Sequence, residues 1–196
     1  MRHLFLILII VSWGCQPPVK QLQKKTDKDS AAANTIINDW GETNCIYKKS
    51  SLTPEKTDPF NKCDKIELIA YEPREVSYKN DQLIIDGNFI VKNIKQRITL
   101  DNIQRDSLFA ILYNYSTNRF GNVSFSADCY TPRHSIVFYK NGEAIAFYEI
   151  CFACYGTRQT KGIPYIDFCD DKWCLLQRFF KDAKINRGIY DEFCPD

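Results

Sequence analysis

The clearest pattern in the chain is a run of apolar residues on both sides of Asn141-Gly142. The segments SIVFYK and EAIAFYEIC have the composition of β-strands, and Asn-Gly is the dipeptide that two-residue hairpin turns favour. We therefore predict a hairpin over residues 135–151, in which the short turn places Lys140 opposite Glu143. Both faces of these strands are apolar, so we expect a central hairpin that is covered on both sides.

The same register, carried along the two strands, predicts which side chains meet. His134 should face Glu149, and Cys129 should lie opposite Cys154 beyond the strand ends. Because side chains alternate along a strand, His134 and Glu149 are expected on one face. A neighbouring glutamate can orient an imidazole, so Arg133, His134 and Glu149 form a possible functional polar cluster.

Shorter apolar segments predict the other strands. Residues 66–71 and 95–100 are strand candidates, and residues 82–91 have the pattern of two strands around the turn pair Asp86-Gly87. The segment YGTRQTKGIP after Cys154 contains Gly, Thr and Pro and is expected to be a loop.

Two segments carry the three- and four-residue apolar spacing of helices that pack by one face. In residues 101–116, Asp106 or Ser107 is a possible cap for the start of the helix. Residues 171–185 form the second helical stripe, and Cys174 lies nearly opposite it. We therefore expect Cys174 to point away from the core.

An unbroken apolar run, residues 4–11, follows Arg2 at the start of the chain. It is shorter than the roughly 20 residues that span a bilayer as a helix, and it is typical of a secretory signal. Cys15 comes directly after Gly14, which resembles the lipobox of bacterial lipoproteins. We therefore expect residues 1–14 to be a signal peptide and Cys15 to be a lipid anchor. The alternative is an ordinary cleaved signal with Cys15 free.

Residues 15–36 combine the anchor with a polar, lysine-rich stretch, which predicts a flexible tether. A single globular domain is then expected over residues 37–196. Removing the signal removes only Arg2 among the charged residues, so Lys plus Arg falls from 26 to 25 against 24 Asp plus Glu. A nearly neutral chain gives no electrostatic reason to bind nucleic acid.

Cysteine usage extends this picture of an exported chain. Eight of the nine cysteines lie outside the anchor, and an even number in an exported protein predicts disulfides. Many pairings are possible from sequence alone. The pairs that position favours are Cys45–Cys63, Cys129–Cys154, Cys151–Cys169 and Cys174–Cys194.

Two chemical alternatives use the same cysteines. Cys129, His134, Cys151 and Cys154 have the ligand types of a zinc or copper site. Extended strands would hold Cys129 and His134 about 16 Å apart, so the chain would have to turn at Pro132. Cys151 and Cys154 could instead form a redox-active C-x-x-C pair, but the expected loop after them differs from the helix of a thioredoxin-type site.

An acid–base role for His134 with Glu149 is a further alternative. The chain has no serine in a G-x-S-x-G setting, and His134 is the single histidine after the signal. We therefore lean away from an enzyme and expect no cofactor.

A longer motif resembles an uncharacterised family of small bacterial proteins, many of them lipoproteins. It reads C-Y-x-P-R-H, an aliphatic strand, I-C-F-x-C, and then F-C before a helix, and it covers roughly residues 129 to 180. The residues that carry it are Cys129, Tyr130, Pro132, Arg133, His134, Ile150, Cys151, Phe152, Cys154, Phe168 and Cys169. The family has no established activity, so the resemblance implies no mechanism.

Together these patterns predict an α+β domain, with a mainly antiparallel sheet centred on the 135–151 hairpin, about two helices packed on it, and disulfide staples. We expect the domain to be tethered to a bacterial membrane through Cys15, facing the periplasm or the cell exterior. Its expected role is that of a non-catalytic binding or assembly module for an envelope protein or a small ligand.

Overall fold

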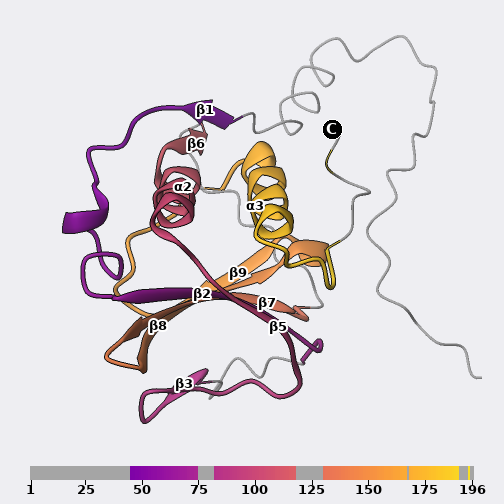
Figure 1. Cartoon of the computed structure of the whole chain (residues 1–196). Helices are drawn as coiled ribbons and strands as arrows, with labels where there is room; N and C mark the ends of the chain where they lie inside the picture. The colour runs from indigo at the N-terminus through magenta and orange to yellow at the C-terminus, as the bar shows by residue number, and fades with distance from the viewer. Residues whose placement is uncertain (1–44, 75–81, 118–129, 167, 190–193, 195–196) are drawn as a thin grey trace, which may run out of the picture.

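A computed structural model of the chain describes residues 45–74, 82–117, 130–166, 168–189 and 194 (Figure 1). Within these ranges, no helix combines the length and the apolar character needed to cross a membrane. The predicted signal peptide, lipid anchor and tether lie outside the described residues.

The described strands include an antiparallel five-stranded sheet, called the main sheet, in the order β5-β2-β7-β8-β9. The predicted hairpin, β7 with β8, lies in its middle and confirms the mainly antiparallel α+β fold. The segment after Cys154 was expected to be a loop, but it contains the edge strand β9, so that prediction is wrong. The strands span Lys65–Tyr71 (β2), Ile94–Thr99 (β5), His134–Lys140 (β7), Glu143–Cys151 (β8) and Gly156–Gln159 (β9).

Two helices of the described chain, α2 (Asn102–Tyr113) and α3 (Asp170–Asp182), cover one face of the main sheet (Figure 1). They contact each other, and Lys172 of α3 is fully buried between them. Its Nζ donates a hydrogen bond to the carbonyl oxygen of Leu112 at 2.9 Å. A cation beside the last carbonyls of a helix is stabilised by the helix dipole, so α3 supplies a charge that the end of α2 favours.

Short elements complete the described fold. β1 (Cys45–Tyr47) pairs with β6 (Tyr115–Thr117) beside the helices. On the opposite face of the sheet, β3 (Ile84–Ile85) and β4 (Asn88–Phe89) form a small hairpin that contacts β8 (Figure 1). Two 3₁₀ turns are also present, η2 (Pro54–Lys56) and η3 (Phe152–Cys154).

Apolar side chains fill both sides of the main sheet, as the apolar faces of the hairpin predicted. On the helix side, Leu68, Ile136 and Phe180 are fully buried. On the other side, Ile69 and Val137 are fully buried beneath the β3–β4 hairpin. Every residue of β7 before Lys140 is buried, which is typical of a strand covered on both faces.

The hairpin register holds only near its turn. Lys140 pairs with Glu143 as predicted, but a bulge at Ile145 shifts the remaining pairs by one residue. A one-residue shift moves side chains to the other face of a sheet. His134 therefore faces Ile150 rather than Glu149, and the predicted pairing of His134 with Glu149 is wrong.

The start of α2 also differs from the expectation that Asp106 or Ser107 caps it. The N-cap is Asp101, whose side chain accepts from the Gln104 backbone N–H at 2.8 Å. The Gln104 side chain accepts in return from the Asp101 backbone N–H at 3.0 Å. This reciprocal capping box makes Asp101, the first residue of the predicted segment, the cap in place of Asp106 or Ser107.

Candidate functional site

The described cysteines form disulfides at three places: Cys45–Cys169, Cys151–Cys154 and Cys174–Cys194. The sequence predicted the third pair, because Cys174 faces away from the core. The predicted Cys45–Cys63, Cys151–Cys169 and Cys129–Cys154 pairs are wrong.

Tertiary contacts explain the changed partners. Pairing of β1 with β6 brings Cys45 to the helices, where Cys169 lies at the start of α3. Cys63 is instead a buried thiol, and burial raises its pKa. The η3 turn folds Cys154 back towards Cys151, with 5.5 Å between their Cα atoms. Cys129 lies outside the described residues.

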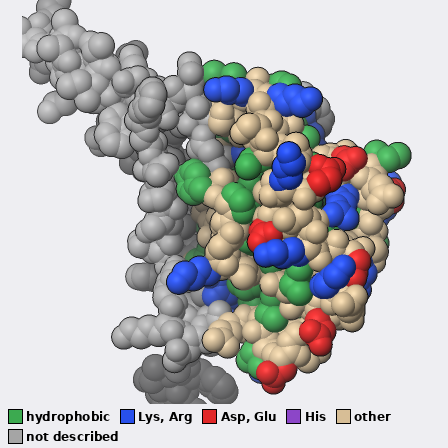
Figure 2. Space-filling view, turned by 90° about the vertical axis from the view of Figure 1, so that its left-hand side faces the viewer, with side chains coloured by type: hydrophobic (Ala, Val, Ile, Leu, Met, Phe, Trp, Pro, Cys, Tyr) green, Lys and Arg blue, Asp and Glu red, His purple; other side chains and the backbone are tan. Residues whose placement is uncertain are grey.

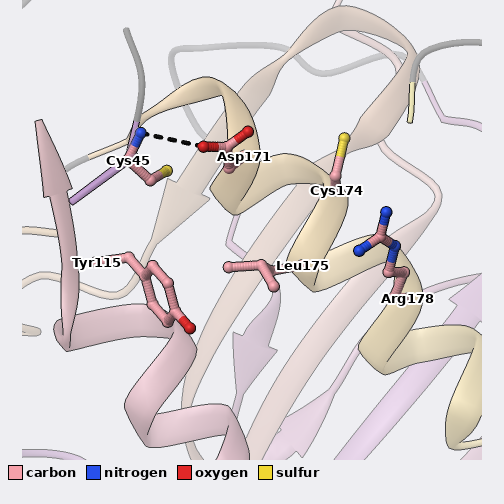
Figure 3. Close-up of a pocket in the computed structure, with 6 residues that line it drawn as sticks. All are labelled: Cys45, Tyr115, Asp171, Cys174, Leu175 and Arg178. Atoms are coloured by element: carbon pink, nitrogen blue, oxygen red, sulfur yellow. Dashed lines mark hydrogen bonds between the residues drawn. The ribbon is translucent and has the colours of Figure 1, made fainter. Parts of the chain in front are cut away.

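The start of α3 joins two of these disulfides around a shallow hollow (Figure 3). The backbone N–H of Cys45 donates to Asp171 Oδ2 at 3.2 Å, and the backbone N–H of Lys172 donates to Cys45 Sγ at 3.1 Å. The hollow has a volume of about 240 Å³, below the range of about 300–1,000 Å³ of typical ligand pockets. Its lining residues are Cys45, Tyr115, Asp171, Cys174, Leu175 and Arg178.

A second hollow adjoins the first along α3 and shares Leu175 and Arg178 with it. It has a volume of about 390 Å³ and lies between α2 and α3, with Ile111 and Phe179 among its lining residues. Leu175 points into the space between the helices in Figure 3. The helix layer therefore carries two neighbouring hollows, of which the second has the more apolar lining.

The densest polar cluster surrounds Glu149, which is fully buried on the sheet face opposite the helices. Its Oε1 accepts from Tyr71 Oη at 2.7 Å, from Arg74 Nη2 at 2.8 Å and from Arg74 Nε at 3.0 Å. Its Oε2 accepts from Arg158 Nε at 3.1 Å and forms an ion pair with Arg158 Nη2 at 3.0 Å. Tyr130 Oη donates to the same oxygen at 3.4 Å.

Sheet register creates this cluster. Glu149 on β8 lies between Ser135 on β7 and Arg158 on β9, so the three side chains share one face. Tyr71, at the end of β2, reaches both Ser135 Oγ at 3.0 Å and the carboxylate. Burial, and then the negative charge of Glu149, raise the pKa of Tyr71 well above its usual value, which keeps the phenol as a donor.

The chemical consequence is that both oxygens of Glu149 already accept several hydrogen bonds. A carboxylate with these partners stabilises the two guanidinium groups and connects the strands that carry them. Its lone pairs point at donors from the protein itself. Sequence reasoning identified Glu149 but missed Arg74, Arg158 and Tyr71. The usable signal was Thr157-Arg158-Gln159, a short polar strand that could have been paired with β8.

His134 lies on the helix side of the sheet, away from Glu149. Its ring packs against Phe152 and Phe180, with centroids 5.0 and 5.6 Å away. Nε2 lies 2.7 Å from the carbonyl oxygen of Arg187. Burial, and to a smaller extent the charge of Arg133, lower the pKa of His134 to about 4. The predicted cluster of Arg133, His134 and Glu149 is therefore not assembled.

The candidate metal ligands do not form a coordinating group among the described residues. No arrangement of three or more His, Cys, Asp or Glu side chains in this part of the chain is suited to a metal ion. Cys151 and Cys154 are bonded to each other, and a disulfide sulfur lacks the thiolate that binds zinc or copper. Of the other two proposed ligands, His134 donates to a backbone carbonyl and Cys129 is not described.

Charge on the face drawn in Figure 2 is mixed in sign. Figure 2 shows basic and acidic side chains interspersed, with small hydrophobic groups between them. Such a face has no single-sign field of the kind that steers nucleic acid. Comparisons of the chain with protein-family models, curated proteins and solved structures give no match.

Proposed function

We propose that the chain is an exported bacterial lipoprotein, anchored through Cys15, whose domain over residues 37–196 is a non-catalytic binding or assembly module of the cell envelope. The observation that carries the proposal is the set of disulfides, two of which attach Cys45 and Cys194 to α3. Disulfides persist in oxidising compartments and are rare in the cytosol. The apolar run before Cys15 supports the anchor.

The non-catalytic part of the proposal is supported by the structural bonds that the candidate reactive side chains already make. Glu149 accepts hydrogen bonds from Tyr71, Arg74 and Arg158, and Cys151 is bonded to Cys154. These side chains hold strand ends together. A domain of this kind presents a rigid surface, which is what binding and assembly require.

Intact mass with and without alkylation tests the disulfides and, with elemental analysis, the alternatives. In the chain recovered from an oxidising envelope, we expect Cys45, Cys169, Cys174 and Cys194 to resist alkylation after denaturation without reductant. We expect the same of the pair at 151 and 154. Alkylation of that pair together with stoichiometric zinc or copper would favour the metal-binding alternative. Alkylation without metal would favour thiol–disulfide exchange.

The anchor requires a separate test. Wild-type chain should fractionate with membranes and carry the added mass of a lipid on Cys15, whereas Cys15→Ala should be recovered as soluble protein. The matched control is Cys63→Ala, which removes a different cysteine and should leave the chain on the membrane. Soluble wild-type chain without added lipid mass would contradict the proposed anchor.

Binding is tested by cross-linking in the intact envelope. The anchored chain should give one recurrent adduct, whereas residues 1–36 fused to an unrelated domain should give none. The purified adduct partner should then bind the isolated chain saturably. If no domain-dependent adduct forms in the producing cell, the binding-module proposal is contradicted while the anchor is unaffected.

A further inference from the structure

The loop that follows α3, residues 184–189, is held against the main sheet by two polar side chains. Gln96 on β5 donates from Nε2 to the carbonyl oxygen of Lys184 at 3.1 Å. Gln96 Oε1 accepts from the backbone N–H groups of Asn186 and Arg187 at 3.1 and 2.9 Å. His134 on β7 forms the remaining contact, to the Arg187 carbonyl oxygen at 2.7 Å. We call residues 184–189 the latch loop.

The hydrogen bond of His134 defines its protonation state. A carbonyl oxygen can only accept, so Nε2 carries the proton and donates it, and Nδ1 holds a lone pair. Among the described residues, Nδ1 is buried and has no hydrogen-bond partner. A second proton would therefore create a buried N–H group with no acceptor, which is an unfavourable state.

The latch loop packs on the edge of the imidazole that carries Cε1 and Nε2, and Nδ1 of the same ring is buried. Gly188 lies so close that a Cβ atom there would be 3.4 Å from His134 Cε1 and 3.3 Å from Arg133 Cδ. Gly188 has φ +73°, a conformation that side chains rarely adopt. On the other side, the rings of Phe152 and Phe180 enclose the imidazole.

The charges around His134 also oppose protonation. Arg133, which directly precedes the strand of His134, acts on the imidazole and disfavours the charged form. On the latch loop, the cation Arg187 pairs with Glu72 at 3.6 Å. The Glu72 side chain is 40% exposed and is shared with Lys95 of β5 at 3.0 Å. The described residues of η3 and α3 that face His134 are aromatic and uncharged.

We propose that the latch loop is an acid-released device, in which a proton from solvent binds Nδ1 of His134 and the loop leaves the sheet so that both ring N–H groups reach water. The closed loop favours the neutral imidazole. The stability that His134 gives to the closed loop is therefore complete above the ordinary pKa of histidine. That contribution is lost as the pH falls towards the depressed value. Opening uncovers His134 and Arg133 together, next to Arg187.

The expected change in the opening constant of the latch loop follows from the pKa of His134 in the open and closed states. With a pKa of 6.5 in the open state and about 4 in the closed state, the opening constant should rise about 20-fold between pH 7 and pH 5. The readout is amide hydrogen exchange of Asn186 and Arg187, corrected for intrinsic rates, since both amides are protected by Gln96. The exported chain is used with His3→Gln, so that His134 is its single histidine whether or not residues 1–14 are removed.

Two variants separate this device from ordinary loop mobility. His134→Gln can still donate to the Arg187 carbonyl but cannot titrate, so its exchange ratio between pH 5 and pH 7 should be close to one. Gln96→Ala removes the acceptor of both reporter amides, so their exchange should rise at both pH values and lose its dependence on opening, which checks that the protection reports the closed loop. NMR titration of the single imidazole in the otherwise unchanged chain should show the depressed pKa, even if neither variant folds. A wild-type ratio below about threefold, or an imidazole that titrates near its ordinary pKa with the loop still protected, would overturn the proposal.

Discussion

The carboxylate of Glu149 illustrates what a buried charge requires from its surroundings. Burying an ionised group without partners costs several kcal/mol. Here Arg74 and Arg158 both contact it, and their side chains are only 20% and 23% exposed. Because the guanidinium groups come from different parts of the chain, Glu149 joins the end of β8 to β9 and to the segment after β2.

Replacing Glu149 should therefore leave Arg74 and Arg158 without their counter-charge and destabilise the domain. We expect Glu149→Gln to lower the free energy of unfolding by about 3 kcal/mol, because two partly buried guanidinium groups lose their counter-charge. Urea denaturation followed by circular dichroism measures the change. Glu143→Gln, the same substitution at an exposed position of the same strand, should leave the midpoint unchanged. A loss below about 1 kcal/mol at Glu149 would show that the ion pairs contribute little.

Sequence reasoning selected Glu149 but assigned it the wrong neighbour. The register from the Asn141-Gly142 turn is correct for Lys140 and Glu143 and fails beyond the bulge at Ile145. A bulge adds one residue to one strand of a pair, and the two-residue turn does not specify where. The true partners, Arg74 and Arg158, lie 75 and 9 residues away in the chain.

At the scale of elements, local signals determined where strands and helices form. The hairpin turn, the strands within 66–71, 82–91 and 95–100 and both helical stripes were predicted from spacing, because side-chain period reflects backbone geometry. The short strands β1, β6 and β9 were missed. For α2, the predicted segment begins at the observed N-cap, Asp101, but the cap was assigned to Asp106 or Ser107 because the capping box was overlooked. Asp101 and Gln104 stand three residues apart, the spacing that the capping box requires.

The capping box gives a direct comparison of two aspartates. Asp101→Ala should destabilise the domain by about 1 kcal/mol, because the Gln104 backbone N–H loses its acceptor. Asp106→Ala, at an exposed position inside the same helix, should change stability much less. Thermal unfolding of the two variants measures the difference. A larger loss at Asp106 would contradict the assignment of Asp101 as the N-cap.

For the whole molecule, the disulfides connect segments that the sheet leaves apart. The Cys45–Cys169 bridge spans 124 residues and ties β1 to α3, whereas Cys151–Cys154 spans only three. Cys174–Cys194 spans 20 residues and holds the C-terminal region at α3. Long closed loops restrict the unfolded chain most, so the three bridges are not equivalent.

Removing the bridges one at a time should destabilise the domain in the order of the lengths of the loops that they close. In the chain-entropy model, paired Cys→Ala changes should cost about 5 kcal/mol for Cys45–Cys169, about 3 for Cys174–Cys194 and about 2 for Cys151–Cys154. Urea unfolding of the three double variants measures the order. If loss of the Cys151–Cys154 pair costs most, the short bridge has a role in native packing that loop closure does not describe.

The sequence by itself determined the features that depend on neighbouring residues: an antiparallel hairpin, two amphipathic helices, and an even set of cysteines after Cys15. Tertiary structure decided the features that depend on distant residues. The bulge at Ile145 placed His134 and Glu149 on opposite sides of the sheet. Pairing of β1 with β6 decided that Cys45 joins Cys169. Local spacing fixes where a side chain lies along its own strand or helix, whereas its partner depends on how separate elements pack together.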